Sequence, residues 1–487
     1  MHSPDPVNAD SLATNLARAR EAVEGARAAQ TGVWAGGARH EVNPSLRLLQ
    51  LSWHHLGPVA LQSSPPGGSQ EPVPGEELLL VWRDPRSGVV RARAAGPDDL
   101  LALKIVVESL ERSDLAAAGT LPAGAIEAVL ERAADAGILL APQPLIARPA
   151  DFPRGEVNDD AFLLSTSFTL QWHVTQSCDL HCRHCYDRTA RRAVPLADAL
   201  RILDDLSAFC SARRVSGAVS LSGGNPLLHP DFKEIYRSAS ERGFGLSILG
   251  NPAPRGRIEE LLAIRAPRFF QVSLEGLPEH NDWMRGAGHF RRTLEFLREL
   301  KELGVSTMVM LTLTADNVDQ VLPLAERLRG LVDDFHFNRL AMVGEGANLR
   351  LPSRERYARF LEEYLEAAER NPALGIKDNL INIPLRRLGL PPFGGCTGFG
   401  CGAAFNFLAL LPDGEAYACR KFPSPVGNAV RDGLAAVYDS PAAQRYRDGC
   451  SACSDCPVRP VCGGCLAVAH GFGLDPLRER DPLCFLA

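Results

Sequence analysis

Three cysteines in the segment 178–187, CDLHCRHCYD, have a spacing that predicts metal chemistry. Cys178, Cys182 and Cys185 follow a C-x3-C-x2-C pattern. Structural zinc sites and most iron–sulfur clusters take four protein ligands. A set of three ligands leaves one coordination position open, and this open position distinguishes a catalytic metal site from a closed structural one. We therefore expect a metal centre that binds a further, non-protein ligand.

A zinc loop is the alternative interpretation of the same residues. Its fourth ligand would be distant in the sequence, or it would be a local side chain such as His181 or His184. The apolar run 168–174, FTLQWHV, reads as a β-strand directly before the loop. This strand-then-loop context favours the open catalytic site.

Length, charge and composition exclude several classes of protein. The chain has 487 residues, enough for roughly three domains. Its net charge of −6 gives no basic field for binding nucleic acid or an anionic membrane, so we expect neither partner. No apolar run reaches the length of about 18 residues that spans a bilayer. The first residues, MHSPDPVNAD, lack the basic and apolar regions of a signal peptide, which predicts a cytoplasmic protein.

Cysteine is unevenly distributed along the chain. Of the 13 cysteines, none lies in residues 1–177 and nine lie between Cys396 and Cys484. In a reducing cytoplasm such clusters are more typical of metal ligands than of disulfides. Cys210 is different, because it continues a helical repeat of leucines and is predicted to be a core residue.

Apolar β runs alternate with helical stretches from residue 168 onward. The runs are 168–174, 217–223, 245–251, 268–276, 306–314 and 334–341, and helices are predicted at 196–214, 231–242, 289–303 and 318–331. Six β–α repeats predict an α/β fold with a parallel sheet, a partial (βα)6 TIM-type barrel. Sites in such folds lie at the carboxyl ends of the strands, which is where the three-cysteine loop falls.

The remaining segments complete the predicted domain organisation. Short strands and two amphipathic helices before the barrel favour a small α+β winged-helix-like domain, and the chain becomes rich in Cys, Gly and Pro after about residue 391. We predict an N-terminal helical segment (1–44), the small winged-helix-like domain (45–148), a linker (149–165), a partial barrel (166–390) and a C-terminal Cys-rich domain (391–487).

Further motifs follow the other predicted strands. LSGGNP (221–226) brings two glycines after the second strand, and glycine allows the backbone to approach a ligand closely. QVSLEG (271–276) ends the fourth strand, and HNDWMRG (280–286) follows it. Together with the C-x3-C-x2-C loop, these motifs resemble those of the radical S-adenosylmethionine (SAM) enzymes.

This resemblance implies specific roles for the motif residues. Cys178, Cys182 and Cys185 would hold three irons of a [4Fe–4S] cluster, and SAM would chelate the fourth. An electron from the cluster would cleave SAM to methionine and a 5′-deoxyadenosyl radical. The implied SAM contacts are Tyr186 near the adenine, the backbone of Gly223 and Gly224 at the amino group, Asn225 in place of the family's usual Glu, Ser273 at the ribose or carboxylate, Arg285 at the carboxylate, and the segment 247–252 at the ribose.

The C-terminal cysteines resemble the SPASM domain of radical SAM peptide-modifying enzymes. Cys401-x12-Gly414-x4-Cys419 and Cys453-x2-Cys456-x5-Cys462 match its pattern, although Cys465 follows after two residues and not three. The resemblance implies two auxiliary [4Fe–4S] clusters. Cys396, Cys401, Cys419 and Cys465 would hold the first, and Cys453, Cys456, Cys462 and Cys484 the second.

Some features of this tail leave alternatives open. Cys450 is left over, as a bystander or a substitute ligand, and two CxxC pairs also fit zinc. LLPDGEAYAC (410–419) predicts a β-hairpin that places Cys401 and Cys419 on neighbouring strands. Sulfatase-maturing members of the family carry an Asp directly after the third auxiliary cysteine. Arg420 stands there in this chain, which disfavours base-assisted oxidation of a Cys or Ser side chain to an aldehyde.

The resemblance as a whole implies an enzyme that modifies a ribosomally made peptide. The domain at 45–148 resembles PqqD-like domains, which bind a leader peptide as an added strand; a generic winged-helix or scaffold domain is the alternative. A flavodoxin or ferredoxin would supply electrons. TLQWHVTQSCDLHCRHCY (169–186) with GGNP (223–226) is most similar to maturases of the selenobiotic (thio/seleno-oxazole) peptide group. The rival hypotheses are a radical SAM oxidoreductase acting on a small molecule and a non-enzymatic cluster or zinc protein.

Overall fold

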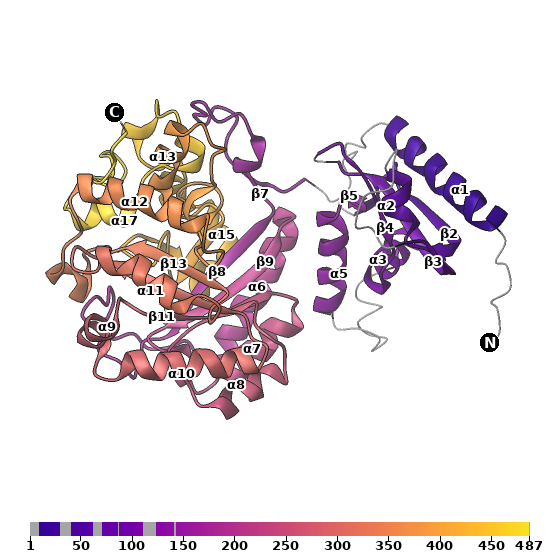
Figure 1. Cartoon of the computed structure of the whole chain (residues 1–487). Helices are drawn as coiled ribbons and strands as arrows, with labels where there is room; N and C mark the ends of the chain where they lie inside the picture. Colours follow the sequence, from indigo (N-terminus) through magenta and orange to yellow (C-terminus); the bar gives the residue numbers. More distant parts are fainter. Residues whose placement is uncertain are drawn as a thin grey trace. The chain divides into compact units, whose positions relative to one another are not determined.

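The computed structural model describes residues 9–29, 40–61, 71–85, 87–110, 123–140 and 143–486. It divides the chain into two compact units, Met1–Gln143 and Pro144–Ala487 (Figure 1). Each unit is described by itself. The five predicted domain boundaries stay predictions.

The first unit is built on an antiparallel sheet in the order β2-β3-β4 (Arg47–His54, Val73–Arg83 and Val90–Ala94). Alternate residues of β3 face opposite sides of this sheet. Leu79 and Val81 pack with α1 (Ala9–Ala28) and α2 (Leu56–Leu61), whereas Leu80 and Trp82 pack with α3 (Pro97–Val107) and α5 (Ala123–Asp135). A second, two-stranded sheet joins β1 (Glu41–Val42) to β5 (Leu139–Leu140). The predicted small α+β domain is confirmed, and α1 packs on the same sheet.

The second unit contains the predicted parallel sheet. A nine-stranded sheet runs in the order β13-β12-β11-β10-β9-β8-β14-β15-β16. Its six barrel strands are β8 (Ser167–Thr175), β9 (Ser216–Gly223), β10 (Gly245–Leu249), β11 (Phe269–Ser273), β12 (Thr307–Leu313) and β13 (Asp334–Arg339), and all are parallel to their neighbours. All six predicted strands are therefore confirmed. A short sheet of β6 (Ile146–Ala147) and β7 (Leu164–Ser165) precedes them.

Helices connect the barrel strands and cover the sheet (Figure 1). They are α6 (Leu196–Arg213), α7 (Phe232–Glu241), α8 (Arg255–Leu262), α9 (Pro278–Arg285), α10 (His289–Glu302), α11 (Val321–Leu328) and α12 (Arg354–Ala368). Along β8, Phe168, Leu170 and Trp172 lie in one core with leucines of α6. Cys210 of α6 is buried in the same core, as predicted.

The Cys-rich tail extends the barrel sheet. β14 (Phe407–Leu410) pairs in parallel with β8, and β15 (Glu415–Tyr417) and β16 (Pro425–Asn428) continue the sheet antiparallel. Short helices complete this region: α13 (Asn382–Arg387), α14 (Ala429–Asp432), α15 (Leu434–Asp439), α16 (Pro441–Asp448) and α17 (Leu466–Gly471).

The hairpin β14–β15 is confirmed, but one detail of the prediction was wrong. Cys401 and Cys419 lie outside the strands, because β14 begins only at Phe407 and β15 ends at Tyr417. The backbone N–H of Cys401 donates to Cys462 O at 3.0 Å, so this cysteine is held by the Cys-rich tail and not by a strand ladder.

The hairpin sets the position of Cys419 along the barrel. Tyr417 pairs with Ala409, which pairs with Gln171 of β8, and β15 runs opposite to β8. The segment after Tyr417 therefore continues toward the beginning of β8, whereas the three-cysteine loop follows the end of β8 at Thr175. At about 3.3 Å per residue along a strand, the two cysteine segments lie at levels that are roughly 15–20 Å apart.

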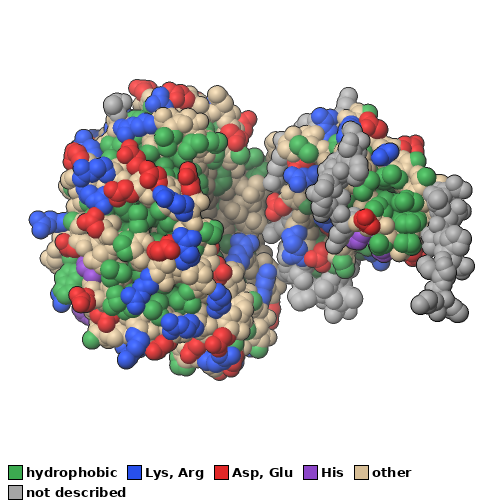
Figure 2. Space-filling view, in the orientation of Figure 1, with side chains coloured by type: hydrophobic (Ala, Val, Ile, Leu, Met, Phe, Trp, Pro, Cys, Tyr) green, Lys and Arg blue, Asp and Glu red, His purple; other side chains and the backbone are tan. Residues whose placement is uncertain are grey.

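Acidic and basic side chains alternate over the face of the larger unit seen in Figure 2, with no extended field of one sign. This distribution agrees with the modest net charge of −6. Among the described residues, no helix combines the length and the apolar character needed to cross a membrane.

Candidate active site and auxiliary cysteine clusters

A cavity of about 270 Å³ opens at the carboxyl ends of the barrel strands. It brings together eight of the predicted cofactor residues: Cys178, Cys182, Cys185, Tyr186, Gly223, Gly224, Ser273 and Arg285. Asn225 lies just outside the lining and is only 3% exposed. A concave pocket lined by several convergent polar groups is typical of a ligand site.

The two glycines of the second-strand motif allow close contact with the start of the cysteine loop. A Cβ atom on Gly223 would lie 2.1 Å from Thr175 O, and one on Gly224 would lie 2.3 Å from Ser177 O. The backbone N–H groups of Gly224 and Asn225 donate to these two carbonyls, at 2.9 and 2.8 Å. The glycines therefore fix the loop against β9, a role in addition to the predicted approach to a ligand.

Asn225 and Asn251 hold the first cysteine through a shared carboxylate. The side-chain amide groups of both residues donate to Asp179 Oδ1, at 3.0 and 2.6 Å, and Asn251 Nδ2 lies 3.7 Å from Cys178 Sγ. Asn225 Oδ1 also accepts from the backbone N–H of Leu227 at 3.3 Å. An amide can donate and accept at once, which a Glu side chain at this position could not do.

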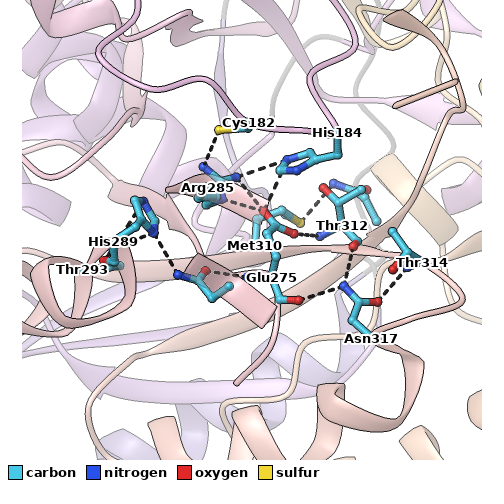
Figure 3. Close-up of polar contacts among 12 residues, drawn as sticks. Cys182, His184, Glu275, Arg285, His289, Thr293, Met310, Thr312, Thr314 and Asn317 are labelled. Atoms are coloured by element: carbon cyan, nitrogen blue, oxygen red, sulfur yellow. Dashed lines mark hydrogen bonds and ion pairs between the residues drawn. The ribbon is translucent and has the colours of Figure 1, made fainter. Parts of the chain in front are cut away.

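Glu275 is a central residue of the site that the sequence analysis missed (Figure 3). Its side chain is 0% exposed and accepts from the guanidinium of Arg285 at 2.6 and 2.9 Å. It also accepts from the backbone N–H of Thr312 at 2.7 Å, and it lies 3.4 Å from His184 Nε2. The available signal was an acidic residue directly after a barrel strand, within the quoted QVSLEG motif.

Arg285 links this carboxylate to the cysteine loop. Its Nη1 lies 3.8 Å from Cys182 Sγ, and its Nη2 lies 3.4 Å from His184 Nε2 (Figure 3). Burial raises the pKa of Glu275, but the charge of Arg285 and the hydrogen bonds from Arg285 and from the Thr312 backbone bring it below its ordinary value. Burial lowers the pKa of His184 to about 4, so this imidazole is neutral. The guanidinium is thus fixed beside a predicted iron ligand, and its predicted contact with a SAM carboxylate stays a prediction.

Tyr186 and His173 form a buried pair at the cavity wall. Tyr186 Oη lies 3.1 Å from His173 Nε2. Burial raises the pKa of Tyr186 to about 12 and lowers that of His173 to about 3, so both side chains are neutral. The ring of Tyr186 is thereby held in place directly after Cys185.

Inward-facing polar residues of the barrel strands form a further part of the lining. They are His173, Ser222, Gln271, Thr312 and Asn338, and they come from β8, β9, β11, β12 and β13. Each alternates with an apolar residue that faces the helices. The sequence analysis used the apolar residues to find the strands and overlooked these polar positions.

The C-terminal cysteines lie in two groups of neighbouring thiols. Burial raises the pKa of Cys401 to about 12, and the neighbouring thiols of Cys465, Cys419 and Cys396 raise it further. Burial also raises the pKa of Cys462, with contributions from Cys456 and Cys484. The charge of Cys462 likewise acts on Cys453. The assignment of these cysteines to two cluster ligand sets stays a prediction.

The chemistry of these groups fits clusters bound through thiolates. Buried thiols with raised pKa values lose their protons only when a metal replaces them. Within the described ranges, no three His, Cys, Asp or Glu side chains are close enough to bind one metal ion. Cluster ligands stand farther apart, because each binds a different iron of the cluster.

Cys450 lies beside the second group. A hydrogen bond with Cys453 lowers the pKa of Cys450 to about 6 and raises that of Cys453. The thiol of Cys450 also donates to Glu479 O at 3.1 Å. It is a buried neighbour of a predicted ligand, and both roles considered for it from the sequence stay open.

A buried ionic network ties the barrel to both cysteine groups. Arg339, at the end of β13, pairs with Asp378 at 2.8 Å and with Asp481 at 2.7 Å. Asp481 accepts from the backbone N–H of Cys465 through its side chain at 2.8 Å, and from that of Cys484 through its carbonyl at 2.9 Å. One cysteine of each group is thus positioned by the same aspartate.

Two family models match this chain. Residues 172–328 match the radical SAM superfamily, and residues 401–465 match the SPASM iron–sulfur cluster-binding domain. The first match spans the barrel strands β9 to β12 with the end of β8, and the second contains the hairpin β14–β15.

Individual curated proteins are similar to this chain at just under 30% sequence identity. The mycofactocin maturase MftC of Mycolicibacterium smegmatis is 28% identical over 367 residues, which cover 70% of this chain and 86% of that protein. The pre-heme d1 synthase of Dinoroseobacter shibae is 29% identical over 183 residues, 36% of this chain and 44% of that protein.

A solved structure shares the fold. Streptococcus suis SuiB bound to its precursor peptide SuiA aligns with a TM-score of 0.55 and 17% identity, covering 84% of this chain and 97% of that one. At this identity the likeness concerns the fold alone.

Proposed function

The chain is a radical SAM enzyme with a SPASM domain, and we propose that it modifies a ribosomally made precursor peptide. One observation carries the proposal: MftC, a maturase by name, matches 70% of this chain and 86% of its own length. The SuiB structure supports it, since that protein of the same fold was solved with its precursor peptide bound.

The cofactors are [4Fe–4S] clusters and SAM. When bound, they supply a 5′-deoxyadenosyl radical that removes a hydrogen atom from the substrate. Cys178, Cys182 and Cys185 would hold the cluster that SAM completes, and the two C-terminal groups would hold two auxiliary clusters. The other proposed SAM contacts are Tyr186, Gly223, Gly224, Asn225, Ser273 and Arg285.

The chain's own residues perform three tasks in this proposal. The glycine backbone and Asp179 hold the cysteine loop in one conformation, with all three cysteines at the cavity where they would hold the cluster. Arg285, fixed by Glu275, places a positive charge beside Cys182. The hairpin β14–β15 extends the sheet at β8 and covers the edge of that strand.

A small-molecule substrate is the second candidate. Relatives that act on tetrapyrroles by name include the pre-heme d1 synthase, matched over less than half of its length, and the AdoMet-dependent heme synthase of Methanosarcina barkeri, which is 25% identical with 66% of this chain and 95% of that protein covered. The peptide proposal is preferred because MftC has the higher identity and the higher coverage of this chain, and because SuiB, which shares the fold, was solved with a precursor peptide bound. The zinc hypothesis is not favoured, because both family matches are to iron–sulfur enzymes and domains.

The proposal also includes the partners of the enzyme and its location in the cell. The leader of the peptide would bind to the small N-terminal domain, a flavodoxin or ferredoxin would supply electrons, and the enzyme would act in the cytoplasm. Membership of the selenobiotic peptide group stays a prediction.

The experiment uses the full chain, purified without oxygen and reconstituted with iron and sulfide. SAM, a reductant and the precursor peptide encoded beside the gene are added, and both products are measured by mass spectrometry. We expect 5′-deoxyadenosine and a peptide of altered mass. Production of 5′-deoxyadenosine with an unaltered peptide, together with turnover of a tetrapyrrole, would favour the second candidate.

A further inference from the structure

Two of the cations that line the cavity, Arg420 and Lys421, have no carboxylate partner among the described residues. Five residues with permanently or ordinarily positive side chains line it: Arg188, Arg285, Arg339, Arg420 and Lys421. Of these, Arg285 pairs with Glu275 at 2.6 Å, Arg339 with Asp481 at 2.7 Å, and Arg188 with Glu345 at 3.8 Å.

Lys421 and Arg420 differ although they are neighbours in the sequence. Lys421 lines the cavity and its charge acts on the thiols of Cys419 and Cys465, so its charge also lies near the first auxiliary group. Arg420 donates from Nη1 to Ser222 Oγ at 3.4 Å and interacts electrostatically with His173 and Tyr186. Its side chain therefore extends into the barrel interior.

In the part of the chain that the structure describes, no carboxylate lies within ion-pair distance of Arg420. The charge of Lys377 is also close to that of Arg420, so another cation adds to the local positive potential. A guanidinium held in a cavity beside another cation favours an anionic ligand, and its planar group fits a carboxylate with two parallel hydrogen bonds.

A second feature points to a ligand at the same place. His173 is 1% exposed and lines the cavity, and its Nδ1 has no hydrogen-bond partner among the described residues. A buried polar atom without a partner is rare in a finished site. His173 and Ser222 are paired residues of β8 and β9, so both lie on the barrel face that Arg420 reaches.

We propose that Arg420, with Ser222 and His173 beside it, binds a carboxylate of the substrate peptide inside the barrel. This subsite rests on the proposed peptide-modifying function and names the chemistry that its substrate must carry. The carboxylate comes from an Asp or Glu side chain in the modified region or from the C-terminus of the peptide. Because Arg420 approaches from the segment after Cys419, it holds the substrate opposite the three-cysteine loop.

The test compares neutral and charged forms of the precursor peptide encoded beside the gene. One form has an amidated C-terminus, and the others carry single Asp→Asn or Glu→Gln changes in the modified region. The kcat/KM for peptide modification is measured by mass spectrometry with the reconstituted enzyme. If the carboxylate makes a charge-assisted hydrogen bond, the kcat/KM of one neutral form is expected to fall by about 10- to 100-fold. The form that loses activity identifies the source of the carboxylate.

The variant Arg420→Gln tests the residue itself. It is expected to lower kcat/KM for the native peptide by a similar factor and to reduce the penalty of the neutral form to less than about 3-fold, because the two changes remove the same contact. Arg420→Lys should recover part of the loss. Arg431→Gln, on the exposed surface of the same domain, is the matched control. With this variant the neutral peptide should still lose the full factor in kcat/KM relative to the native peptide.

Iron content and SAM affinity are measured for every variant, since SAM also carries a carboxylate. A fall of about tenfold in SAM affinity for Arg420→Gln, with the peptide penalty retained, would overturn the proposal by assigning Arg420 to SAM. If Arg420→Gln fails to hold its iron, the same comparison is made with Arg420→Lys. Equal modification of all peptide forms by the wild type refutes the subsite alone, whereas no modified peptide at all refutes the proposed function.

Discussion

The buried pair of Glu275 and Arg285 allows a prediction of magnitude. In Glu275→Gln the neutral side chain keeps nearly the same shape but loses the charge. Both carboxylate oxygens accept from donors, one from Arg285 and the other from the backbone N–H of Thr312, so the new amide NH2 must face a donor. The guanidinium is left unpaired in a site where Glu275 is 0% exposed. Removing one partner of a buried ion pair costs about 3–5 kcal/mol.

This cost translates into a shift of the melting temperature. With an unfolding entropy of about 2 cal/mol/K per residue over roughly 340 residues of the larger unit, the expected fall in Tm is about 4–7 °C. Differential scanning calorimetry of anaerobic, iron-loaded protein provides the measurement. The cluster bound by the three-cysteine loop should also be lost more readily, because Arg285 lies 3.8 Å from Cys182 Sγ.

The double variant Glu275→Gln/Arg285→Met provides the control. It removes both charges and should recover a substantial part of the lost Tm, because no charge remains buried without a partner. Two results would refute the assignment of Glu275 as the partner that holds Arg285. The first is a Tm for Glu275→Gln within about 1 °C of the wild type. The second is a fall in Tm for the double variant that exceeds the added falls of Glu275→Gln and Arg285→Met.

Three other changes test separate parts of the site. Gly224→Ala would place a Cβ 2.3 Å from Ser177 O, so the cysteine loop must shift. We expect SAM affinity, measured by equilibrium dialysis, to fall at least about tenfold, and an unchanged affinity would contradict the packing argument. Arg339→Met leaves Asp481 buried without its cation and should release iron from both auxiliary groups, measured as iron per chain; unchanged iron content would show that the network is not needed. Burial lowers the pKa of His289 to about 4, below the ordinary 6.5, so the unfolded state takes up the proton first and stability is lost as pH falls from about 6.5 to 4. His289→Gln should remove up to about 1.4 kcal/mol per pH unit from this slope in acid-dependent denaturation, and an unchanged slope assigns the titration to other groups.

Much of the barrel could be predicted from the sequence because its strands are buried on the helix-facing side. Leu170 and Trp172 on β8 mark one face, and the following loop begins where that apolar pattern ends. The cysteine spacing then fixed the position of the site, since strands of a parallel sheet place their following loops at one end. Strand β2 was not predicted individually, because exposed Leu48 and half-buried Leu49 blur the alternation that marks a strand.

Side-chain partners were harder to predict. Arg285 was identified, but its partner Glu275 was not, because pairing across ten residues depends on how α9 folds back against β11. The placement of Cys401 also depends on tertiary contacts, here with Cys462 of the tail. The unpaired charge of Arg420 appears only when the partners of every other cation in the cavity are known.

The electron paramagnetic resonance spectrum of the reduced protein, before and after addition of SAM, tests the central claim most directly. To isolate the relevant cluster, the measurement uses the double variant Cys419→Ala/Cys453→Ala beside the wild type, with Cys182→Ala as the negative control. If Cys178, Cys182 and Cys185 hold a cluster with one open iron, SAM changes the spectrum of the first two proteins and not that of Cys182→Ala. A spectrum that SAM leaves unchanged in iron-loaded wild-type protein, or one that changes equally in Cys182→Ala, would contradict the account.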